Sequence, residues 1–116
     1  MDAKAFAAEW EAGWNSHDLD RILEHYGDDI VFRSRKAEAL TGDGEVRGKV
    51  ALAAYRSAAL ARQPNLAFRI EDLFVGAGVL TIVYRNHDGV RAAETLWSDA
   101  DGRVRQAAAC HPPEPD

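Results

Sequence analysis

The second half of the chain is divided by glycine-containing turns, and this pattern limits the fold more than any other feature. Asp88-Gly89 and Asp101-Gly102 each separate two runs in which apolar and polar residues alternate. An Asp-Gly pair in that position is typical of a tight β-hairpin, because glycine readily adopts the positive φ angles of such turns. Gly76-Ala77-Gly78 marks a further turn. The pattern predicts strands over residues 66–75, 79–87, 90–98 and 103–110.

The first part of the chain has helical spacing instead. Trp10 and Trp14 are four residues apart in an apolar stripe, and Asp2 precedes the stripe as the expected N-cap. Asp18 is placed to cap a second helix, and Gly27 is expected to end it. Two helices are therefore expected before the first strand.

The middle of the chain combines a strand, a loop and a helix. Residues 30–34 alternate as a half-buried strand would, and the polar residues 35–47 predict a loop. A third helix is expected over about residues 49–62, ending before Pro64. Because helices come first and hairpin-linked strands come last, the sequence predicts an α+β fold with an antiparallel sheet.

The length of 116 residues fits one domain with its own core. We expect a single domain over residues 1–116. Its ordered core should span about residues 3–111, and the proline-rich tail 112–116 should end the fold.

Charge and cysteine content exclude several classes of protein. The net charge of −5 and the pI near 5.3 argue against nucleic acid or an anionic membrane as the main partner. No apolar run reaches the roughly 18 residues of a membrane span, and residues 1–15 lack the layout of a signal peptide. Cys110 is the only cysteine, so no internal disulfide can form, which suits a reducing cytosol. A soluble, cytoplasmic protein is expected.

The sequence contains no recognisable metal or cofactor motif. The histidines at positions 17, 25, 87 and 111 lack the spacing of metal ligands. A glycine-rich phosphate loop and a nucleophile elbow are also missing from the sequence. No metal and no cofactor is therefore expected.

Several short strings carry a resemblance to a known family. Trp14-Asn15-Ser16-His17-Asp18-Leu19-Asp20 is followed by Tyr26-Gly27-Asp28-Asp29, by Gly48 before a helix, and by Asp101-Gly102-Arg103-Val104. In this order they resemble the nuclear-transport-factor-2-like superfamily, and within it the bacterial SnoaL-like branch. The resemblance covers residues 3–111. It implies a cone-shaped, curved antiparallel sheet that encloses a pocket, with three helices closing its mouth.

The resemblance also implies partners and a range of functions. Members include ketosteroid isomerase, polyketide cyclases, epoxide hydrolases, oxygenase small subunits and binding domains, so the fold alone does not fix the function. Members usually form dimers through the outer face of the sheet. Tyr84 and Trp97 are expected on that face as large apolar side chains without a covering helix, which favours a homodimer.

Hairpin pairing predicts which side chains face the pocket. A two-residue turn at Asp88-Gly89 would pair Val83 with Glu94 and place Arg85 on the same face. A two-residue turn at Asp101-Gly102 would pair Glu94 with Ala109, and opposed residues share a face. The resemblance suggests that this face lines the cone. The expected ligand-binding residues, with those from the helices and the first strand, are Trp10, Trp14, Tyr26, Phe32, Ser34, Tyr55, Val83, Leu96, Ala107 and Ala109.

Glu94 is the main catalytic candidate. A carboxyl group on an inward face is costly to bury in its charged form, and burial raises its pKa toward the range of a general acid or base. Arg85 on the adjacent strand and His111 at the end of the last strand could tune it. The alternatives are a structural ion pair between Glu94 and Arg85 and a strand-end histidine without a catalytic role.

Comparison with ketosteroid isomerase argues against its mechanism in this chain. The buried acid that stabilises the oxyanion in that enzyme falls on Glu94. Its catalytic base falls on Ser34, which cannot replace a carboxylate, and its tyrosine falls on Trp10, whose indole has no acidic O–H. Steroid isomerisation by that mechanism is not expected.

Three hypotheses remain open at this point. In the first, the protein binds a small hydrophobic molecule, and Glu94 supports acid–base isomerase, lyase or hydrolase chemistry. In the second, it is a non-catalytic dimeric module that binds a ligand or partner in the same cone. In the third, it is a structural dimer whose pocket is filled by side chains.

Overall fold

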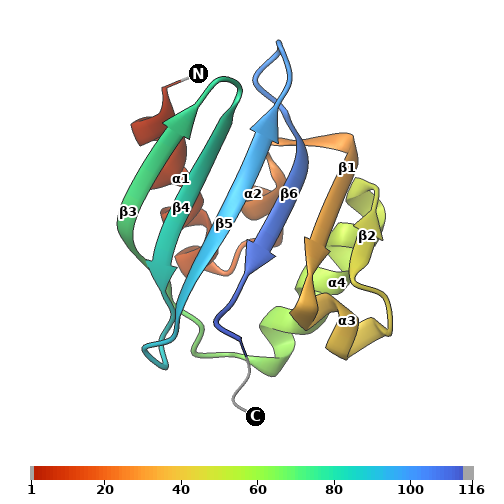
Figure 1. Cartoon of the computed structure of the whole chain (residues 1–116). Coiled ribbons are helices and arrows are strands. Elements are labelled where there is room, and N and C mark those ends of the chain that lie inside the picture. The colour runs from red at the N-terminus through yellow and green to blue at the C-terminus, as the bar shows by residue number, and fades with distance from the viewer. Residues whose placement is uncertain (1, 114–116) are drawn as a thin grey trace.

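The computed structural model describes residues 2–113 and shows a six-stranded curved sheet with helices packed against one face (Figure 1). The sheet is not closed into a barrel, and the strand order is β2-β1-β6-β5-β4-β3. In the described residues, no helix has the length and apolar character to span a bilayer. In chain order the elements are α1 (Ala3–Ser16), α2 (Leu19–Leu23), β1 (Tyr26–Ser34), α3 (Arg35–Thr41), β2 (Glu45–Arg47), α4 (Lys49–Arg62), β3 (Arg69–Gly76), β4 (Val79–Arg85), β5 (Arg91–Ser98) and β6 (Val104–Cys110).

The predicted α+β class is confirmed, but the sheet is mixed. The strands from β3 to β6 pair antiparallel with their sequence neighbours, as the turns predict. β1 pairs parallel with β6, and β2 adds antiparallel to the outer side of β1. The parallel pair forms because the chain crosses from β1 through the helices and the hairpins before β6 returns beside it. In Figure 1, the orange β1 and dark blue β6 lie side by side.

The helix starts agree with the sequence, whereas one helix end does not. Asp2 caps α1 by accepting a hydrogen bond from the N–H of Ala5, and Asp18 caps α2. Gly27 does not end α2, which stops at Leu23. Gly27 is instead a buried residue of β1, because pairing with β6 already begins at Tyr26.

The predicted loop over residues 35–47 is wrong, because it contains α3 and β2. The side chain of Ser34 caps α3 by accepting a hydrogen bond from the N–H of Lys36 at 3.1 Å. Gly42 ends α3 with a φ of 87°, a left-handed conformation that glycine adopts without strain. The helix predicted over residues 49–62 is confirmed as α4. The described chain therefore has four helices where three are predicted.

The prediction of a two-residue turn at Asp88-Gly89 is wrong. Tyr84 pairs with Ala92 and Ile82 pairs with Glu94, so the loop between the two strands runs from Asn86 to Val90. The side-chain oxygen of Asn86 holds this loop by accepting hydrogen bonds from the N–H groups of Asp88 and Val90. The longer loop shifts the pairing by one residue, and a shift of one residue turns every side chain of β4 to the other face.

This shift reverses three predicted orientations. Tyr84 lies on the helix-covered face and is only 4% exposed, so it cannot form part of an outer dimer surface. Val83 and Arg85 lie on the opposite face from Glu94.

The predicted two-residue turn at Asp101-Gly102 is also wrong, because Ser98 pairs with Val104 and the loop runs from Asp99 to Arg103. An irregularity between Trp97 and Ser98 restores the register, so Glu94 pairs with Ala109 as predicted.

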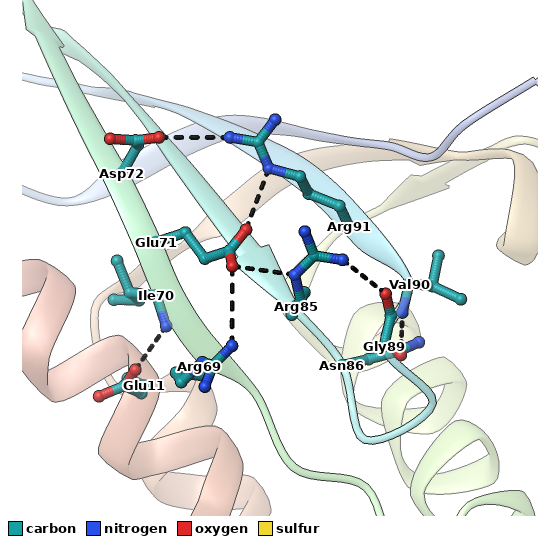
Figure 2. A network of polar contacts seen from close by, with 10 residues as sticks. All are labelled: Glu11, Arg69, Ile70, Glu71, Asp72, Arg85, Asn86, Gly89, Val90 and Arg91. Carbon is teal, nitrogen blue, oxygen red and sulfur yellow. Dashed lines mark hydrogen bonds and ion pairs between the residues drawn. The ribbon is translucent and has the colours of Figure 1, made fainter.

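Arg85 belongs to an ion-pair network on the outer side of the sheet. Its Nε donates to Glu71 at 2.9 Å, and Arg91 donates to the same carboxylate at 3.0 Å (Figure 2). Arg69 lies 3.7 Å from Glu71, and Nη1 of Arg85 also donates to the backbone oxygen of Gly89. Because these groups are partly exposed, each pair adds little stability. Arg85 therefore pairs with Glu71 on the outer face, and it does not lie beside Glu94 in the pocket as predicted.

The tail is described only in part. Pro112 and Pro113 follow β6 without regular structure, in agreement with the prediction that the proline-rich tail ends the fold. Residues 114–116 of that tail lie outside the described residues.

Candidate functional site

A cavity of about 80 Å³ lies between the sheet and the helices. Its walls combine apolar and polar side chains from α1, β1, α3, α4, β4, β5 and β6 and from the segment before β3. The lining residues are Trp14, Phe32, Ser34, Lys36, Tyr55, Arg56, Ala59, Gln63, Leu66, Phe68, Tyr84, Asn86, Ala92, Glu94, Ala109 and His111.

Glu94 is the only carboxylate in this wall, and it is 3% exposed. Its Oε2 accepts a hydrogen bond from the indole Nε1 of Trp10 at 3.1 Å and one from the hydroxyl of Tyr26 at 3.4 Å. Among residues 2–113, no group donates to its Oε1. One oxygen is therefore fixed by the protein, and the other is left for a group in the cavity.

Burial raises the pKa of Glu94 above its ordinary value. The positive charge of Arg56 and the hydrogen bonds from Trp10 and Tyr26 oppose this effect without cancelling it. A carboxyl group with a raised pKa holds its proton to a higher pH than an exposed one, which suits a general acid–base group.

Arg56 is the largest fully buried side chain of the described protein, with 1% of its surface exposed. Its Nη2 donates to the hydroxyl of Tyr26 at 3.3 Å, so Tyr26 links Arg56 to Glu94. The guanidinium also lies over three aromatic rings, with its Cζ 4.7 Å from the ring centre of Tyr26 and 5.0 Å from those of Trp14 and Phe32. Such contacts help to stabilise a cation that is shielded from water.

The sequence analysis missed Arg56, although a signal exists. Arg56 follows the fully buried Leu52 by one helical turn and precedes Leu60 by another, so all three share one face of α4. A charged residue in the apolar stripe of a helix is unusual and indicates a buried partner.

Three tyrosines surround the carboxyl group of Glu94 or the cavity beside it. Burial raises the pKa of Tyr26 to about 12, and burial together with Glu94 raises the pKa of Tyr84 further. Burial also raises the pKa of Tyr55. These phenols stay protonated at neutral pH, so they can act as hydrogen-bond donors. The side chain of Tyr84 also lines the cavity.

His111 is half-buried in the cavity wall, just beyond β6. Burial, assisted by the charge of Lys36, lowers the pKa of His111, which favours the neutral imidazole. Its Nδ1 has no hydrogen-bond partner in the described part of the chain. His111 and Glu94 thus share a cavity without a hydrogen bond between them.

The structure places the remaining predicted residues in three positions. Trp10 and Tyr26 lie behind the cavity, where they contact Glu94. Leu96 and Ala107 are paired with each other in the buried core, and Val83 lies on the other face of the sheet. The predicted residues that do line the cavity are Trp14, Phe32, Ser34, Tyr55, Glu94, Ala109 and His111.

The lining residues that were not predicted have identifiable causes. Lys36 belongs to α3, which was expected to be a loop, and Leu66 and Phe68 precede β3 where a strand was expected. Tyr84 and Asn86 were missed because the hairpin loop is longer than predicted. Within residues 2–113, no cluster of three or more His, Cys, Asp or Glu is placed to hold a metal ion.

Comparison with known proteins identifies the family. The sequence model of the SnoaL-like domain matches residues 7–111. The chain belongs to the SnoaL-like family. A SnoaL-like protein of unknown function from Burkholderia thailandensis is 36% identical, with a TM-score of 0.90, and the match covers 96% of this chain and 95% of that one. A search of curated protein sequences found no match.

Other SnoaL-like or related folds are similar in structure at lower identity. AclR, a proposed hydroxylase from Streptomyces galilaeus, is 21% identical with a TM-score of 0.74, over 95% of this chain and 88% of that one. A proposed polyketide cyclase from Sinorhizobium meliloti is 14% identical with a TM-score of 0.74, over 90% of this chain and 93% of that one. At such identity the likeness shows the fold alone, so the function must be argued from the cavity of this chain.

Proposed function

We propose that this SnoaL-like protein binds a small molecule in its cavity and that Glu94 transfers a proton to or from it. The observation that supports this proposal is a buried carboxyl group with a raised pKa, one oxygen of which is held by Trp10 and Tyr26 while the other is free. Buried groups with shifted pKa values in a cavity are typical of acid–base sites. The proton transfer would serve an isomerase, lyase or hydrolase reaction.

The neighbouring groups suit this role. Tyr26 donates to Glu94 and accepts from Arg56, so it holds the carboxyl group and carries part of the positive charge of Arg56 toward it. The hydroxyl of Tyr84, whose side chain lines the cavity, can donate to an oxygen of the substrate as negative charge develops there. Glu94 and Tyr84 are the residues that we place beside the reacting atoms of the substrate.

The cavity favours a compact ligand. Its volume of about 80 Å³ is well below the roughly 300–1,000 Å³ of pockets that enclose drug-sized molecules. Arg56, Tyr84 and Phe68 fill space that a wider cone would leave open. A small cyclic or acyclic molecule, or one arm of a larger one, fits these dimensions better than a steroid.

A non-catalytic binding module is the second candidate, and one observation supports it. Ser34 stands where ketosteroid isomerase has its base, and here its hydroxyl accepts a hydrogen bond from the backbone of α3. Glu94 is then the single carboxylate of the cavity. With no second carboxylate, the site would bind a ligand without turning it over.

The substitution Glu94→Gln separates the two candidates. A panel of small carbonyl compounds and epoxides would be screened first for binding and turnover. For any compound that is turned over, the variant should lose about 10²- to 10⁴-fold in rate, while its dissociation constant changes only a few-fold. Glu24→Gln, an exposed carboxylate at the end of α2, is the matched control and should keep full activity. Full activity in Glu94→Gln would refute the acid–base role.

We also propose a homodimer through the outer sheet face, in a cytoplasmic protein. Phe74 and Trp97 are 61% and 41% exposed on β3 and β5. The register brings Phe74 beside Thr81, and Thr81 beside Thr95, on the face away from the helices. Exposed aromatic side chains on the uncovered face of a sheet support self-association.

A further inference from the structure

Two of the three guanidinium nitrogens of the buried Arg56 have no hydrogen-bond acceptor in the described part of the chain. Only Nη2 donates, to Tyr26, whereas Nε and Nη1 are buried and have no partner among residues 2–113. A buried, unpaired charged donor is costly, and such groups are rare in folded proteins. Arg56 also lines the cavity. Its free N–H groups therefore need an acceptor that enters from the cavity.

A second donor in the same wall is also unpaired. The indole Nε1 of Trp14 is buried without a partner in the described residues, and the Trp14 ring lies 5.0 Å from the Cζ of Arg56. Trp14 lines the cavity as well. An indole nitrogen can only donate. Two adjacent residues thus offer N–H groups, and both require an electron-rich oxygen.

The charges of the cavity wall also favour an electron-rich ligand. Its charged residues are the cations Lys36 and Arg56 and the single carboxylate Glu94, in a protein whose net charge is −5. Burial favours the uncharged form of Glu94. With Glu94 protonated, the wall is positive, so it attracts an anion although the molecule as a whole repels one.

We propose that the cavity recognises a small organic anion, a carboxylate or an enolate, whose charged oxygen accepts hydrogen bonds from Arg56 and Trp14. This inference rests on the proposed function, since the same cavity would hold the substrate of Glu94. Arginine is suited to the task because its planar fork matches a carboxylate. Water is the competing occupant, because a cavity of this size could hold a few molecules.

Binding of the anion should be linked to proton uptake by Glu94. The groups that face Glu94 are Trp10 on α1, Tyr26 on β1, Arg56 on α4 and Tyr84 on β4, with Lys36 and His111 elsewhere in the wall. Within residues 2–113, Arg56 is the only fixed charge that acts directly on Glu94. An ionised Glu94 and an anionic ligand would compete for the charge of Arg56, so the ligand binds best when Glu94 is protonated.

The test compares small carboxylates with amides of the same shape. Acetate, crotonate and benzoate would be titrated against acetamide, crotonamide and benzamide at constant ionic strength. Binding would be followed by NMR at the indole N–H of Trp14 and at Nε–H of Arg56. At least one carboxylate should bind tenfold or more tightly than its amide, and both signals should shift. Equal affinities, no binding, or shifts confined to surface residues would overturn the proposal.

The pH dependence provides a second measurement. The affinity for the carboxylate should fall as the pH rises through the pKa of Glu94, by up to tenfold per pH unit. Glu94→Gln should keep the preference for the carboxylate and lose the pH dependence. An affinity in the wild type that does not change between pH 5 and pH 9 would contradict the proposed coupling.

Substitution of Arg56 completes the test. Arg56→Met should abolish the preference for carboxylates, whereas Arg62→Met, an exposed position on the same helix, should leave it intact. If Arg56→Met does not fold, the double variant Arg56→Met/Glu94→Gln removes both buried charges and takes its place. A carboxylate preference that survives without Arg56 would refute the assignment.

The two proposals can fail separately. If carboxylates are preferred but Glu94→Gln retains full turnover, the anion site stands and the acid–base role falls. If Glu94→Gln abolishes turnover while carboxylates and amides bind equally, the acid–base role stands and the anion site falls.

Discussion

At the scale of single residues, the site depends on two buried ionisable side chains, Arg56 and Glu94, that are not in direct contact. Arg56 and Glu94 are both almost fully buried, and Tyr26 stands between them with a hydrogen bond to each. Because the phenol of Tyr26 separates the two groups, the positive charge of Arg56 acts on Glu94 more weakly than it would in a direct ion pair. The pKa of Glu94 therefore stays raised although a buried cation lies nearby. A direct contact with the guanidinium would have lowered this pKa.

The raised pKa predicts how stability depends on pH. The folded protein binds the proton of Glu94 more tightly than the unfolded chain does, so this stabilisation is complete below the ordinary value of 4.5 and is lost as the pH rises through the folded-state pKa. Glu94→Gln cannot titrate. Its free energy of unfolding, relative to the wild type, should increase with pH by about 1.4 kcal/mol for each unit of pKa shift.

Urea unfolding of both proteins at a series of pH values measures this difference. A difference that stays constant from pH 4 to pH 9 would show that the pKa of Glu94 is the same in the folded and unfolded states.

At the scale of elements, the hairpin between β4 and β5 decides which side chains enter the cavity. Because the loop Asn86–Val90 is longer than a two-residue turn, Tyr84 faces the helices, and Val83 and Arg85 face away. The Asp-Gly pair correctly predicted that a hairpin forms there. It could not give the loop length, because that depends on the side chain of Asn86, which accepts hydrogen bonds from the backbone N–H groups of Asp88 and Val90.

Asn86→Ala should therefore weaken this hairpin. The substitution removes two hydrogen bonds of 2.9 Å to backbone N–H groups, and at roughly 0.5–1.5 kcal/mol each the free energy of unfolding should fall by about 1–3 kcal/mol. Asn65→Ala is the control, at an exposed turn position. Chemical unfolding of the two variants compares them, and equal stabilities would show that the Asn86 side chain does not hold the loop.

Local signals predicted most elements, and tertiary contacts decided the rest. The bounds of α4 follow from periodicity and from the turn residues that stop the helix. The pairing of Glu94 with Ala109 was also predicted, but it depends on an irregularity between Trp97 and Ser98 that the turn residues do not indicate. The parallel pairing of β1 with β6 has no local signal, since it joins Phe32 to Ala107. The position of Arg56 could be predicted from its place on α4, but its link to Glu94 through Tyr26 required the three-dimensional structure.

At the scale of the whole molecule, the two faces of the sheet have different roles. The helix-covered face holds the core and the cavity, whereas the other face has Phe74 and Trp97 exposed together with partly exposed ion pairs around Glu71. In the proposed function, the first face would bind the ligand and the second face would contact another copy of the chain.

Trp97→Glu should disrupt the proposed homodimer, because the new carboxylates would be buried without partners in the interface. We expect the wild type to sediment as a dimer at micromolar concentration and the variant as a monomer. Val50→Glu, which changes an 87% exposed apolar residue on α4, is the control and should leave the dimer intact. A monomeric wild type would refute the proposed interface.

The pairing of β1 with β6 has a consequence for the order of folding. This pairing closes a loop that runs from Tyr26 to Val104. The entropic cost of closing the loop must be met before the contacts between β1 and β6 are gained. The cavity takes walls from both ends of that loop, from Trp14 through to His111. During synthesis on the ribosome, early segments can form helices and hairpins, but the binding site is assembled only after the last strand has emerged. A ligand that is present at that moment would selectively stabilise completed molecules over unfinished ones.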